Sequence, residues 1–297
     1  MESKLNNIYS ILSKDIEEFN SCYIDTLESP VKLINKVINY ISKSKGKQLR
    51  PILLLLSSNL CNKPNSKTYL AAALVELLHV ATLIHDDIVD DADIRRGFPS
   101  IKRIWKNKIS LLIGDYMFSQ ALQNMIKIRD FDALDLLSDT ARRLSEGEIL
   151  QIEKAIKKDM DEKIYFDMVK DKTASLFSAS CMLGAITVTT DNEKRNALSR
   201  YGEKLGIAFQ IKDDLFDIVG KIDSIGKPIG FDVKKNMFTL PLIYALSNLK
   251  GLNKRKFLIK LKKLTRQKKI NKIRSMIKDS GGIKYTQDIM YRISKEA

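Results

Sequence analysis

The stretch KTYLAAALVELLHVATLIHDDIVDDADIRR, residues 67–96, decides the fold class of this chain. It contains neither glycine nor proline, the two residues that interrupt helices most strongly. Apolar residues recur in it at the spacing of one helix face: Leu70, Leu74, Leu77, Leu78, Ala81, Ile84 and Ile88. Asn65–Ser66 before the stretch and Gly97–Phe98–Pro99 after it are typical start and stop signals. The pattern predicts one long helix over 67–96 with aspartates at its C-terminal end.

Residues 194–219 show the same pattern and end in FQIKDDLFD before Gly220. Further predicted helices lie near 4–22, 31–43, 51–61, 109–127, 131–155, 162–187, 238–248, 254–265, 268–279 and 284–295. No strand pattern, internal repeat or low-complexity linker stands out. Glycine (13) and proline (6) are too scarce for a strand-rich chain of 297 residues. We therefore expect an all-α fold in a single domain over residues 1–297.

The cysteine pattern bears on the compartment. Cys22, Cys61 and Cys181 are odd in number, far apart and without a C-x-x-C pair. This argues against a disulfide framework or a zinc site and favours a reducing environment. The N-terminal MESKLNNIYS has no signal-peptide core, and we expect no apolar run long enough to span a bilayer. These features favour a cytoplasmic protein.

The net charge of +15 comes mostly from one C-terminal segment. Between Lys250 and Lys278 there are 13 Lys or Arg and no acidic residue. Apolar residues recur there at helical spacing with lysines between them, which indicates a basic amphipathic helix pair. Two interpretations stay open. The segment is either a solvated helix pair whose apolar face packs on the core, or a peripheral contact with an anionic membrane.

Two aspartate clusters end the two long predicted helices. The first cluster comprises Asp86, Asp87 and Asp90, and the second comprises Asp213, Asp214 and Asp217. Residues four apart lie on one helix face, so the outer two carboxylates of each cluster point the same way. Carboxylates this close resist ionisation unless a cation neutralises them, and the C-terminal end of a helix is unfavourable for anions. Mg²⁺, which takes oxygen ligands and substrate phosphates, would remove both penalties.

A solvated acidic helix face is the usual explanation for one such cluster. Two DD-x-x-D clusters, each ending a long apolar helix and each followed by basic residues and glycine, are far more specific. We expect them to face each other across a cavity and to grip one diphosphate between them through Mg²⁺.

Basic residues that could bind phosphate accompany both clusters. Arg95 and Arg96 follow the first cluster, and Lys227 follows the second in GKPIGFD. The motif GKQLRP, residues 46–51, stands at a predicted helix start, where free backbone N–H groups favour anions. Lys172–Thr173 lies within the predicted 162–187 helix. Singly, each is an ordinary surface charge, but together they supply cations for a substrate that carries phosphate.

These motifs resemble those of the trans-prenyl diphosphate synthases, in family order over roughly residues 46–293. The matching segments are GKQLRP, ELLHVATLIHDDIVDDADIRRG, GDYMFSQA, GEILQ, DKTASLF, FQIKDDLFDIVG, GKPIGFD and TLP. The resemblance implies the all-α isoprenoid synthase fold, with about ten core helices around a central cavity. It also implies a homodimer whose substrates are isopentenyl diphosphate and an allylic diphosphate.

The resemblance further implies residue roles. Lys47, Arg50, His79 and Arg96 would bind the diphosphate of isopentenyl diphosphate, and Arg95, Lys172, Thr173, Gln210 and Lys227 would hold the allylic diphosphate. Asp86, Asp90 and Asp213, supported by Asp87 and Asp217, would bind about three Mg²⁺ ions. Asp86, Asp90, Lys172, Gln210 and Asp213 are thus the predicted catalytic residues. Met237 stands where similar enzymes carry a second lysine before TLP, and His85 is expected to be structural.

Product length is predicted from the helix that carries the first cluster. Ala81 and Thr82 lie one turn before Asp86, where short-chain relatives often carry bulky aromatic residues. Small residues there would leave a path for the growing chain, so we expect a medium- or long-chain product of the octaprenyl type. The alternative is that Ala81 only packs against another helix and that the enzyme makes farnesyl or geranylgeranyl diphosphate.

Three other functions fit the sequence less well. A terpene cyclase usually carries an Asn/Ser/Glu-type second metal motif, which the intact DDLFD at 213–217 does not match. A non-catalytic partner subunit would have lost aspartates, whereas both clusters are complete. A nucleic-acid binder is suggested by the positive charge, but no recognised binding motif or aromatic interleaving supports it.

Overall fold

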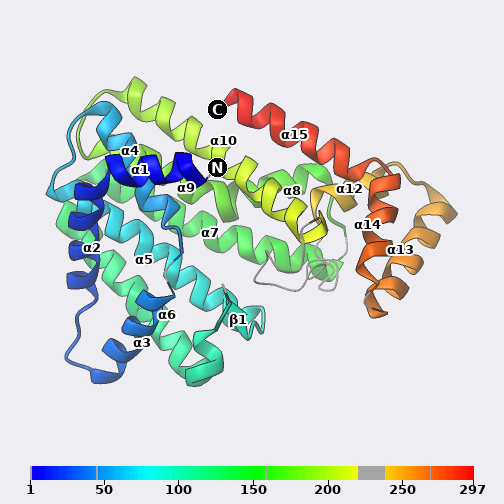
Figure 1. Cartoon of the computed structure of the whole chain (residues 1–297), viewed down its shortest axis with the longest axis horizontal. Coiled ribbons are helices and arrows are strands. Elements are labelled where there is room, and N and C mark those ends of the chain that lie inside the picture. The colour runs from blue at the N-terminus through cyan, green and yellow to red at the C-terminus, as the bar shows by residue number, and fades with distance from the viewer. Residues whose placement is uncertain (1, 45, 96, 158, 220–237, 268) are drawn as a thin grey trace. The chain divides into compact units, whose positions relative to one another are not determined.

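The computed structural model describes residues 2–44, 46–95, 97–157, 159–219, 238–267 and 269–297, and helices dominate this part of the chain (Figure 1). The first half contains α1 (Glu2–Ile11), α2 (Ser13–Leu27), α3 (Lys32–Lys43), α4 (Leu49–Cys61), α5 (Ser66–Val89), β1 (Ile94–Arg95), β2 (Phe98–Pro99) and α6 (Ile101–Ile128). The second half contains α7 (Phe131–Lys157), α8 (Glu162–Val169), the π-helical turn η1 (Lys170–Ala174), α9 (Ser175–Ile186), α10 (Asn192–Val219), α12 (Leu240–Ser247), α13 (Gly251–Arg266), α14 (Ile270–Asp279) and α15 (Gly282–Glu296). The predicted all-α class is confirmed.

Several predicted boundaries were wrong for local reasons. The helix expected at 4–22 is two helices, because the buried Leu12 leaves helical geometry between α1 and α2. The helix expected at 67–96 ends at Val89, and the next residues form a small antiparallel hairpin that turns at Gly97 with φ +80°. The helix expected at 109–127 lies within α6, which starts earlier, at Ile101, where the Ser100 side chain accepts from the Arg103 N–H. Lys106 interrupts α6 with φ +67°, so the expected helix corresponds to the part of α6 after this kink.

The described chain forms two compact units, each assembled from separate stretches of sequence. Unit 1 consists of Met1–Ala141 and Leu176–Gly202, and unit 2 consists of Arg142–Ser175 and Glu203–Ala297. The expectation of a single domain stays a prediction. The first aspartate cluster belongs to unit 1, and the second belongs to unit 2.

Helix α5 is the core helix of unit 1. It packs against α2, α4 and α6, and every residue from Ala71 to Leu78 is buried. Small residues allow close approach of the neighbouring helices. A Cβ at Gly114 on α6 would lie 2.2 Å from His85 Nε2, and one at Gly184 on α9 would lie 2.3 Å from the Leu54 carbonyl oxygen. Burying this apolar helix is therefore what assembles unit 1.

Helix α5 also corrects one expectation about apolar length. In length and composition it could cross a bilayer, and no other helix in the described ranges meets both criteria. Most of its apolar stretch is buried inside the unit. A core helix of a folded domain meets the same criteria, so the length of α5 reflects its central position.

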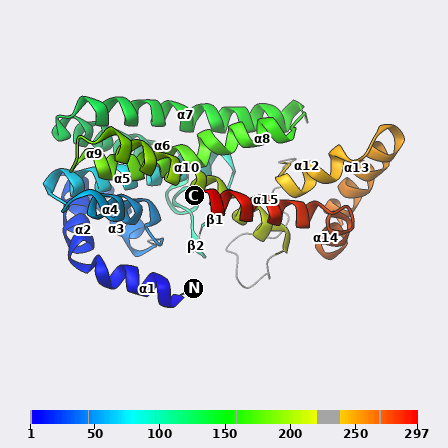
Figure 2. The ribbon, with the colours of Figure 1, turned by 90° about the horizontal axis from the view of Figure 1, so that it is seen from above.

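Two apolar clusters lie in the described part of unit 2. One joins Tyr165 and Val169 of α8 to Ile211 and Leu215 of α10, with α12 and α15 packed around them. The other contains residues of α10, α12, α13 and α14: Ile218, Leu242, Leu246, Leu261, Leu264, Ile273 and Ile277. Figure 2 shows α13, α14 and α15 in orange to red, following one another along the chain. The C-terminal end of α10 is thus held by both clusters.

Candidate active site

The first aspartate cluster occupies the last turn of α5. An Asn65–Thr68 capping box starts this helix, and the Asp90 N–H closes it by donating to the Asp86 carbonyl, 2.7 Å away. Asp86 and Asp90 are partly exposed, whereas Asp87 is only 4% exposed. The three carboxylates therefore differ in environment, as the 100° turn per residue predicts.

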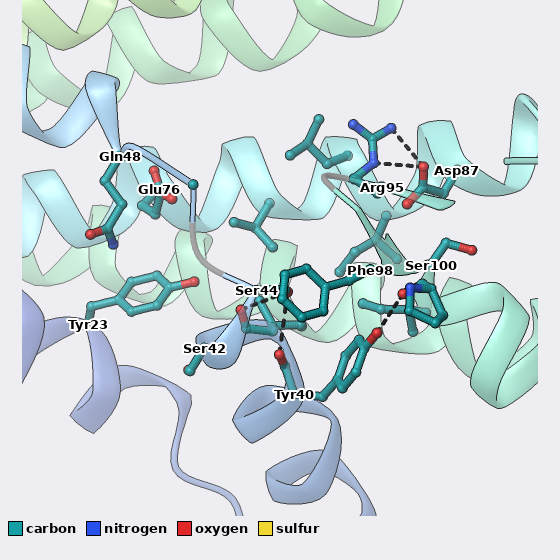
Figure 3. Close-up of a pocket in the computed structure, with 17 residues that line it drawn as sticks. Tyr23, Tyr40, Ser42, Ser44, Gln48, Glu76, Asp87, Arg95, Phe98 and Ser100 are labelled. Atoms are coloured by element: carbon teal, nitrogen blue, oxygen red, sulfur yellow. Dashed lines mark hydrogen bonds and ion pairs between the residues drawn. The ribbon is translucent and has the colours of Figure 1, made fainter. Parts of the chain in front are cut away.

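Asp87 is held by Arg95 from the hairpin. The Arg95 Nε and Nη2 atoms both lie 2.7 Å from Asp87 Oδ1, and Figure 3 shows this arginine directed at the carboxylate. A charged hydrogen-bond pair of this kind compensates the burial of the aspartate. The hairpin β1–β2 thus fixes Arg95 beside the cluster. Whether Arg95 also contacts the allylic diphosphate stays a prediction.

The turn after α5 is fastened by the first turn of α6. Asp91 adopts φ +52° and is ion-paired with Lys102, and Arg103 Nη1 lies 2.9 Å from Asp93 Oδ2. The Ser100 hydroxyl donates to the Ala92 carbonyl at 2.7 Å. The acidic residues beyond Asp90 therefore serve the turn, which leaves Asp86, Asp87 and Asp90 as the cluster.

The GKQLRP motif forms the start of α4, as predicted. Gln48 adopts φ +46° and α4 begins at Leu49. Arg50 Nη1 lies 2.9 Å from His79 Nε2 on α5, and the guanidinium stacks over Phe177 at 4.7 Å. Arginine can only donate, so His79 Nε2 accepts and the ring is held in the neutral Nδ1–H tautomer. The structure thus brings two of the predicted diphosphate ligands into contact, while Lys47 is exposed.

A pocket lies on a neighbouring face of α5 (Figure 3). Glu76, Val80 and Asp87 line it from α5, and the hairpin, the end of α3 and the α3–α4 loop complete it. Of the predicted site residues, Asp87 and Arg95 line it. Its volume of about 70 Å³ suits a few water molecules. We therefore do not assign the substrate site to this pocket.

The second aspartate cluster lies at the end of α10 in unit 2. Asp213 is exposed, Asp217 is partly exposed and Asp214 is buried. Asp214 accepts from the Tyr165 hydroxyl at 2.6 Å and from Gln210 Nε2 at 2.8 Å. Burial raises the pKa of Asp214 to about 6, with the charges of Asp213 and Asp217 acting in the same direction and the two hydrogen bonds opposing. As in the first cluster, the middle aspartate, here Asp214, is buried and hydrogen-bonded inside the protein.

A hydrogen-bonded chain links this cluster to the π-helical turn η1. Gln210 Oε1 accepts from the Thr173 hydroxyl at 2.8 Å, and Lys172 Nζ lies 2.7 Å from Gln151 Oε1 on α7 and is ion-paired with Glu148. A Cβ at Gly147 would lie 2.6 Å from the Lys172 backbone nitrogen, so glycine permits the close approach of α7. Lys172, Thr173 and Gln210, all predicted site residues, are thus connected.

Sequence reasoning missed Tyr165, Glu148 and Gln151 as members of this network. Glu148 and Gln151 stand three apart in GEILQ, a spacing that places both on one helix face. That signal could have identified them as partners of a lysine. Nothing in the local sequence around Tyr165 indicates its contact with Asp214, 49 residues away.

The donor chemistry of both clusters fits a hard divalent cation. Each offers carboxylate oxygens on one helix face, and Asp86, Asp90 and Asp213 are accessible to solvent. In the part of the chain that the structure covers, no three His, Cys, Asp or Glu side chains already converge as a metal site. Metal binding by the predicted ligands therefore stays a prediction, supported by residue type and exposure.

The remaining predicted residues are placed as follows. Ala81 is 1% exposed, and the Thr82 hydroxyl donates to the His79 carbonyl at 2.8 Å. His85 Nε2 lies 3.4 Å from both the Leu111 carbonyl oxygen and Asp115 Oδ1, against Gly114 on α6, which agrees with its expected structural role. Arg96, Lys227 and Met237 lie outside the described residues.

Comparisons with known proteins agree with the fold and the motifs. The sequence profile of the polyprenyl synthetase family matches residues 31–279, and the chain belongs to this family. It is 35% identical to heptaprenyl diphosphate synthase component 2 of Bacillus subtilis (strain 168), over 86% of this chain and 74% of that one. It is 34% identical to octaprenyl diphosphate synthase of Escherichia coli (strain K12), over 82% and 75% of the two chains. A geranylgeranyl diphosphate synthase is among its relatives as well.

A solved structure gives the same result for the fold. The polyprenyl synthase from Caulobacter crescentus CB15, crystallised with calcium and isoprenyl diphosphate, superposes with a TM-score of 0.89 at 30% identity. The match covers 97% of this chain and 88% of that one. The chain is therefore a prenyltransferase with the isoprenoid synthase fold, and its family acts through divalent metal.

Proposed function

We propose that this protein is a Mg²⁺-dependent polyprenyl diphosphate synthase. It adds isopentenyl diphosphate units to an allylic diphosphate, such as farnesyl or geranylgeranyl diphosphate, and makes a medium- or long-chain all-trans product, as for a quinone side chain. The observation that carries the proposal is that the two aspartate clusters have the same arrangement. Each ends a long helix, buries its middle aspartate against fixed partners, and keeps aspartates accessible on the outer positions.

The proposed reaction begins with ionisation of the allylic C–O bond. Mg²⁺, when bound, would neutralise the diphosphate and make it a better leaving group. Asp86, Asp90 and Asp213, supported by Asp217, would hold about three such ions. Lys172, held by Glu148 and Gln151, stands ready as a positioned cation, so it needs little reorganisation as charge develops on the leaving oxygen.

Carbon–carbon bond formation follows. The double bond of isopentenyl diphosphate attacks the allylic cation, and the new cation loses a proton to the released diphosphate. Lys47, Arg50, His79 and Arg96 would bind the diphosphate of isopentenyl diphosphate. The contact between Arg50 and His79 supports this assignment, because it fixes the guanidinium in one orientation.

Heptaprenyl and octaprenyl synthases among the relatives favour the medium- or long-chain product. The geranylgeranyl diphosphate synthase among the relatives supports the alternative of a short-chain product. The Bacillus relative is named as one component of an enzyme, which suggests a partner subunit as the alternative to a homodimer. We propose a homodimer in the cytoplasm, with both clusters catalytically competent.

One experiment tests the proposed function directly. The purified full-length protein is incubated with labelled isopentenyl diphosphate and allylic primers of three lengths, with Mg²⁺ or with a chelator, and the products are measured by mass spectrometry. We expect a ladder of all-trans polyprenyl diphosphates ending at a medium or long chain, and no product in chelator. A cyclised hydrocarbon, or incorporation that stops after one unit, would replace the proposal by a cyclase or a short-chain synthase.

A further inference from the structure

The basic segment, Lys250–Lys278, covers α13 and α14 in unit 2. Its 13 cations and no acid account for most of the net charge of +15. The catalytic residues proposed above do not include it. Its apolar face is used within the unit, since Leu261 and Leu264 of α13 pack with Ile273 and Ile277 of α14 in one cluster. The amphipathic pattern expected from the sequence is thus confirmed.

The opposite face of α13 is the unusual one. Leu252 and Ile259 are 73% and 60% exposed there. They stand seven residues apart, which places them on the same side of the helix. Exposed cations share this outer side: Arg255, Lys256, Lys262, Lys263 and Arg266. A single exposed aliphatic residue needs no explanation, but two aligned within a ring of cations form a mixed apolar and cationic surface.

An open hollow lies on the C-terminal half of this surface. Ile259, Lys262, Lys263, Arg266 and Gln267 line it. Among the described residues no ion pair engages a cation of α13, whereas lysines elsewhere in the unit, such as Lys157 and Lys204, pair with glutamates. The positive charge of the outer side of α13 is therefore available to an external anion.

We propose that the outer side of α13 docks on an anionic lipid bilayer, with Leu252 and Ile259 entering the headgroup region and the surrounding cations contacting lipid phosphates. Aliphatic side chains partition into this region, and each nearby Lys or Arg adds to the attraction. A single-stranded nucleic acid would instead need aromatic side chains for stacking, and the only aromatic residue of α13, Phe257, packs against the apolar cluster. A duplex is bound mainly through its phosphates, so it would make no use of the exposed Leu252 and Ile259.

Docking would place an insoluble polyprenyl product at the bilayer that receives it. Delivery of the product to the bilayer rests on the proposed function, whereas the docking of α13 on lipid does not depend on it. The surface belongs to a unit that also holds the second aspartate cluster, and the Arg274 side chain of α14 contacts the end of α10. Membrane contact and the catalytic helix thus share one folded unit.

Vesicle flotation of the full-length protein, without substrate, tests the docking. We compare phosphatidylcholine vesicles that contain phosphatidylglycerol with vesicles of phosphatidylcholine alone, at low salt and at 1 M salt, where the Debye length is only about 3 Å. We expect flotation with the anionic vesicles at low salt alone. Equal binding to neutral vesicles, or undiminished binding at 1 M salt, would overturn the proposal.

Matched variants separate this surface from net charge. Each cation near the bilayer contributes roughly a fivefold gain in partitioning, so Lys262→Gln with Lys263→Gln should weaken flotation roughly 30-fold. Ile259→Gln should weaken it as well, without a change of charge. Lys32→Gln with Lys36→Gln, exposed positions on α3, removes the same charge and should bind like the unchanged protein. If both double variants weaken binding equally, only net charge matters and the proposal fails.

Two further readouts complete the test. A duplex RNA is offered in a gel-shift assay, and loss of RNA binding with unchanged flotation in the Lys262/Lys263 variant would reassign the surface to nucleic acid. Turnover is measured separately in detergent with a short soluble primer. A protein that floats but is inactive would contradict the proposed function alone, whereas an active protein that does not float would contradict only the docking.

Discussion

At the residue scale, each aspartate cluster combines one buried carboxylate with carboxylates that are accessible to solvent. Asp87 and Asp214 are buried and held by Arg95, or by Tyr165 and Gln210. Asp86 and Asp213 keep contact with solvent. The middle aspartate of each cluster is therefore fixed by its partners inside the protein, and the outer aspartates are suited to bind metal.

This division predicts the effect of removing an outer charge. Asp86→Asn or Asp213→Asn keeps the shape of the side chain and removes the anionic ligand. We expect each to lower kcat at least about a hundredfold, a loss of about 2.7 kcal/mol, with unchanged thermal unfolding. Asp135→Asn, at an exposed position on α7, is the matched control. Near-normal turnover by either variant would exclude the carboxylate from metal binding.

Ala81 carries the prediction about product length. Ala81→Phe would place a ring about one turn from Asp86, and products should shorten toward fifteen or twenty carbons, three or four five-carbon units, while incorporation continues. Because Ala81 is 1% exposed, the larger side chain also strains the packing, so unfolding is measured in parallel. An unchanged product ladder from folded protein would show that the chain leaves by another route.

At the element scale, helix ends decide how the catalytic residues are presented. The last two turns of α10 carry three aspartates, near a helix end where the dipole opposes negative charge. Arg274 of α14 offsets this by donating from Nε to the Ile218 carbonyl, 2.8 Å away. The cation thus satisfies a C-terminal carbonyl that the helix itself leaves unbonded.

Arg274 should accordingly stabilise unit 2. We expect Arg274→Met to lower the free energy of unfolding by about 1.5–3 kcal/mol, the usual contribution of a hydrogen bond to a charged group, and Arg274→Lys to recover part of it. Lys272→Met, on the exposed side of the same helix, should change stability by less than about 0.5 kcal/mol. Chemical denaturation provides the measurement. Equal effects of the two methionine variants would deny Arg274 this role.

At the scale of the whole molecule, an apolar surface on unit 1 supports the proposed homodimer. Helix α6 exposes large apolar side chains along its length: Leu111, Leu112, Phe118, Leu122 and Ile126. A row of this size is uncommon on a monomer. A second copy of the chain would cover it, and the two copies would then bury the same face in each other.

The oligomeric state tests this surface. By light scattering after gel filtration, we expect the protein to have twice the mass of one chain. Leu122→Glu with Ile126→Glu should yield monomers, because carboxylates would be buried in the interface. Leu60→Glu, at a position that is 76% exposed on α4, should leave the dimer intact. A monomeric unchanged protein would favour a separate partner subunit instead.

The sequence by itself determined the helical class, both aspartate clusters and the basic amphipathic pair. These features are periodic or contiguous, so a residue's own neighbours in sequence encode them. The same holds for the start of α4 at GKQLRP and for the long central helix α5. Assignment of catalytic roles to Lys172, Thr173 and Gln210 came from family resemblance, and local periodicity alone would not have given it.

Only the tertiary structure decided which side chains meet. Asp87 pairs with Arg95 because the chain reverses between α5 and β1, where Asp91 adopts φ +52°. Lys172 contacts Glu148 and Gln151 because Gly147 lets α7 approach the π-helical turn. The Tyr165–Asp214 contact depends on burial shared by two distant helices. Such pairs form because a buried charge or hydroxyl must find a partner when water is excluded, and that requirement exists only after the helices have packed.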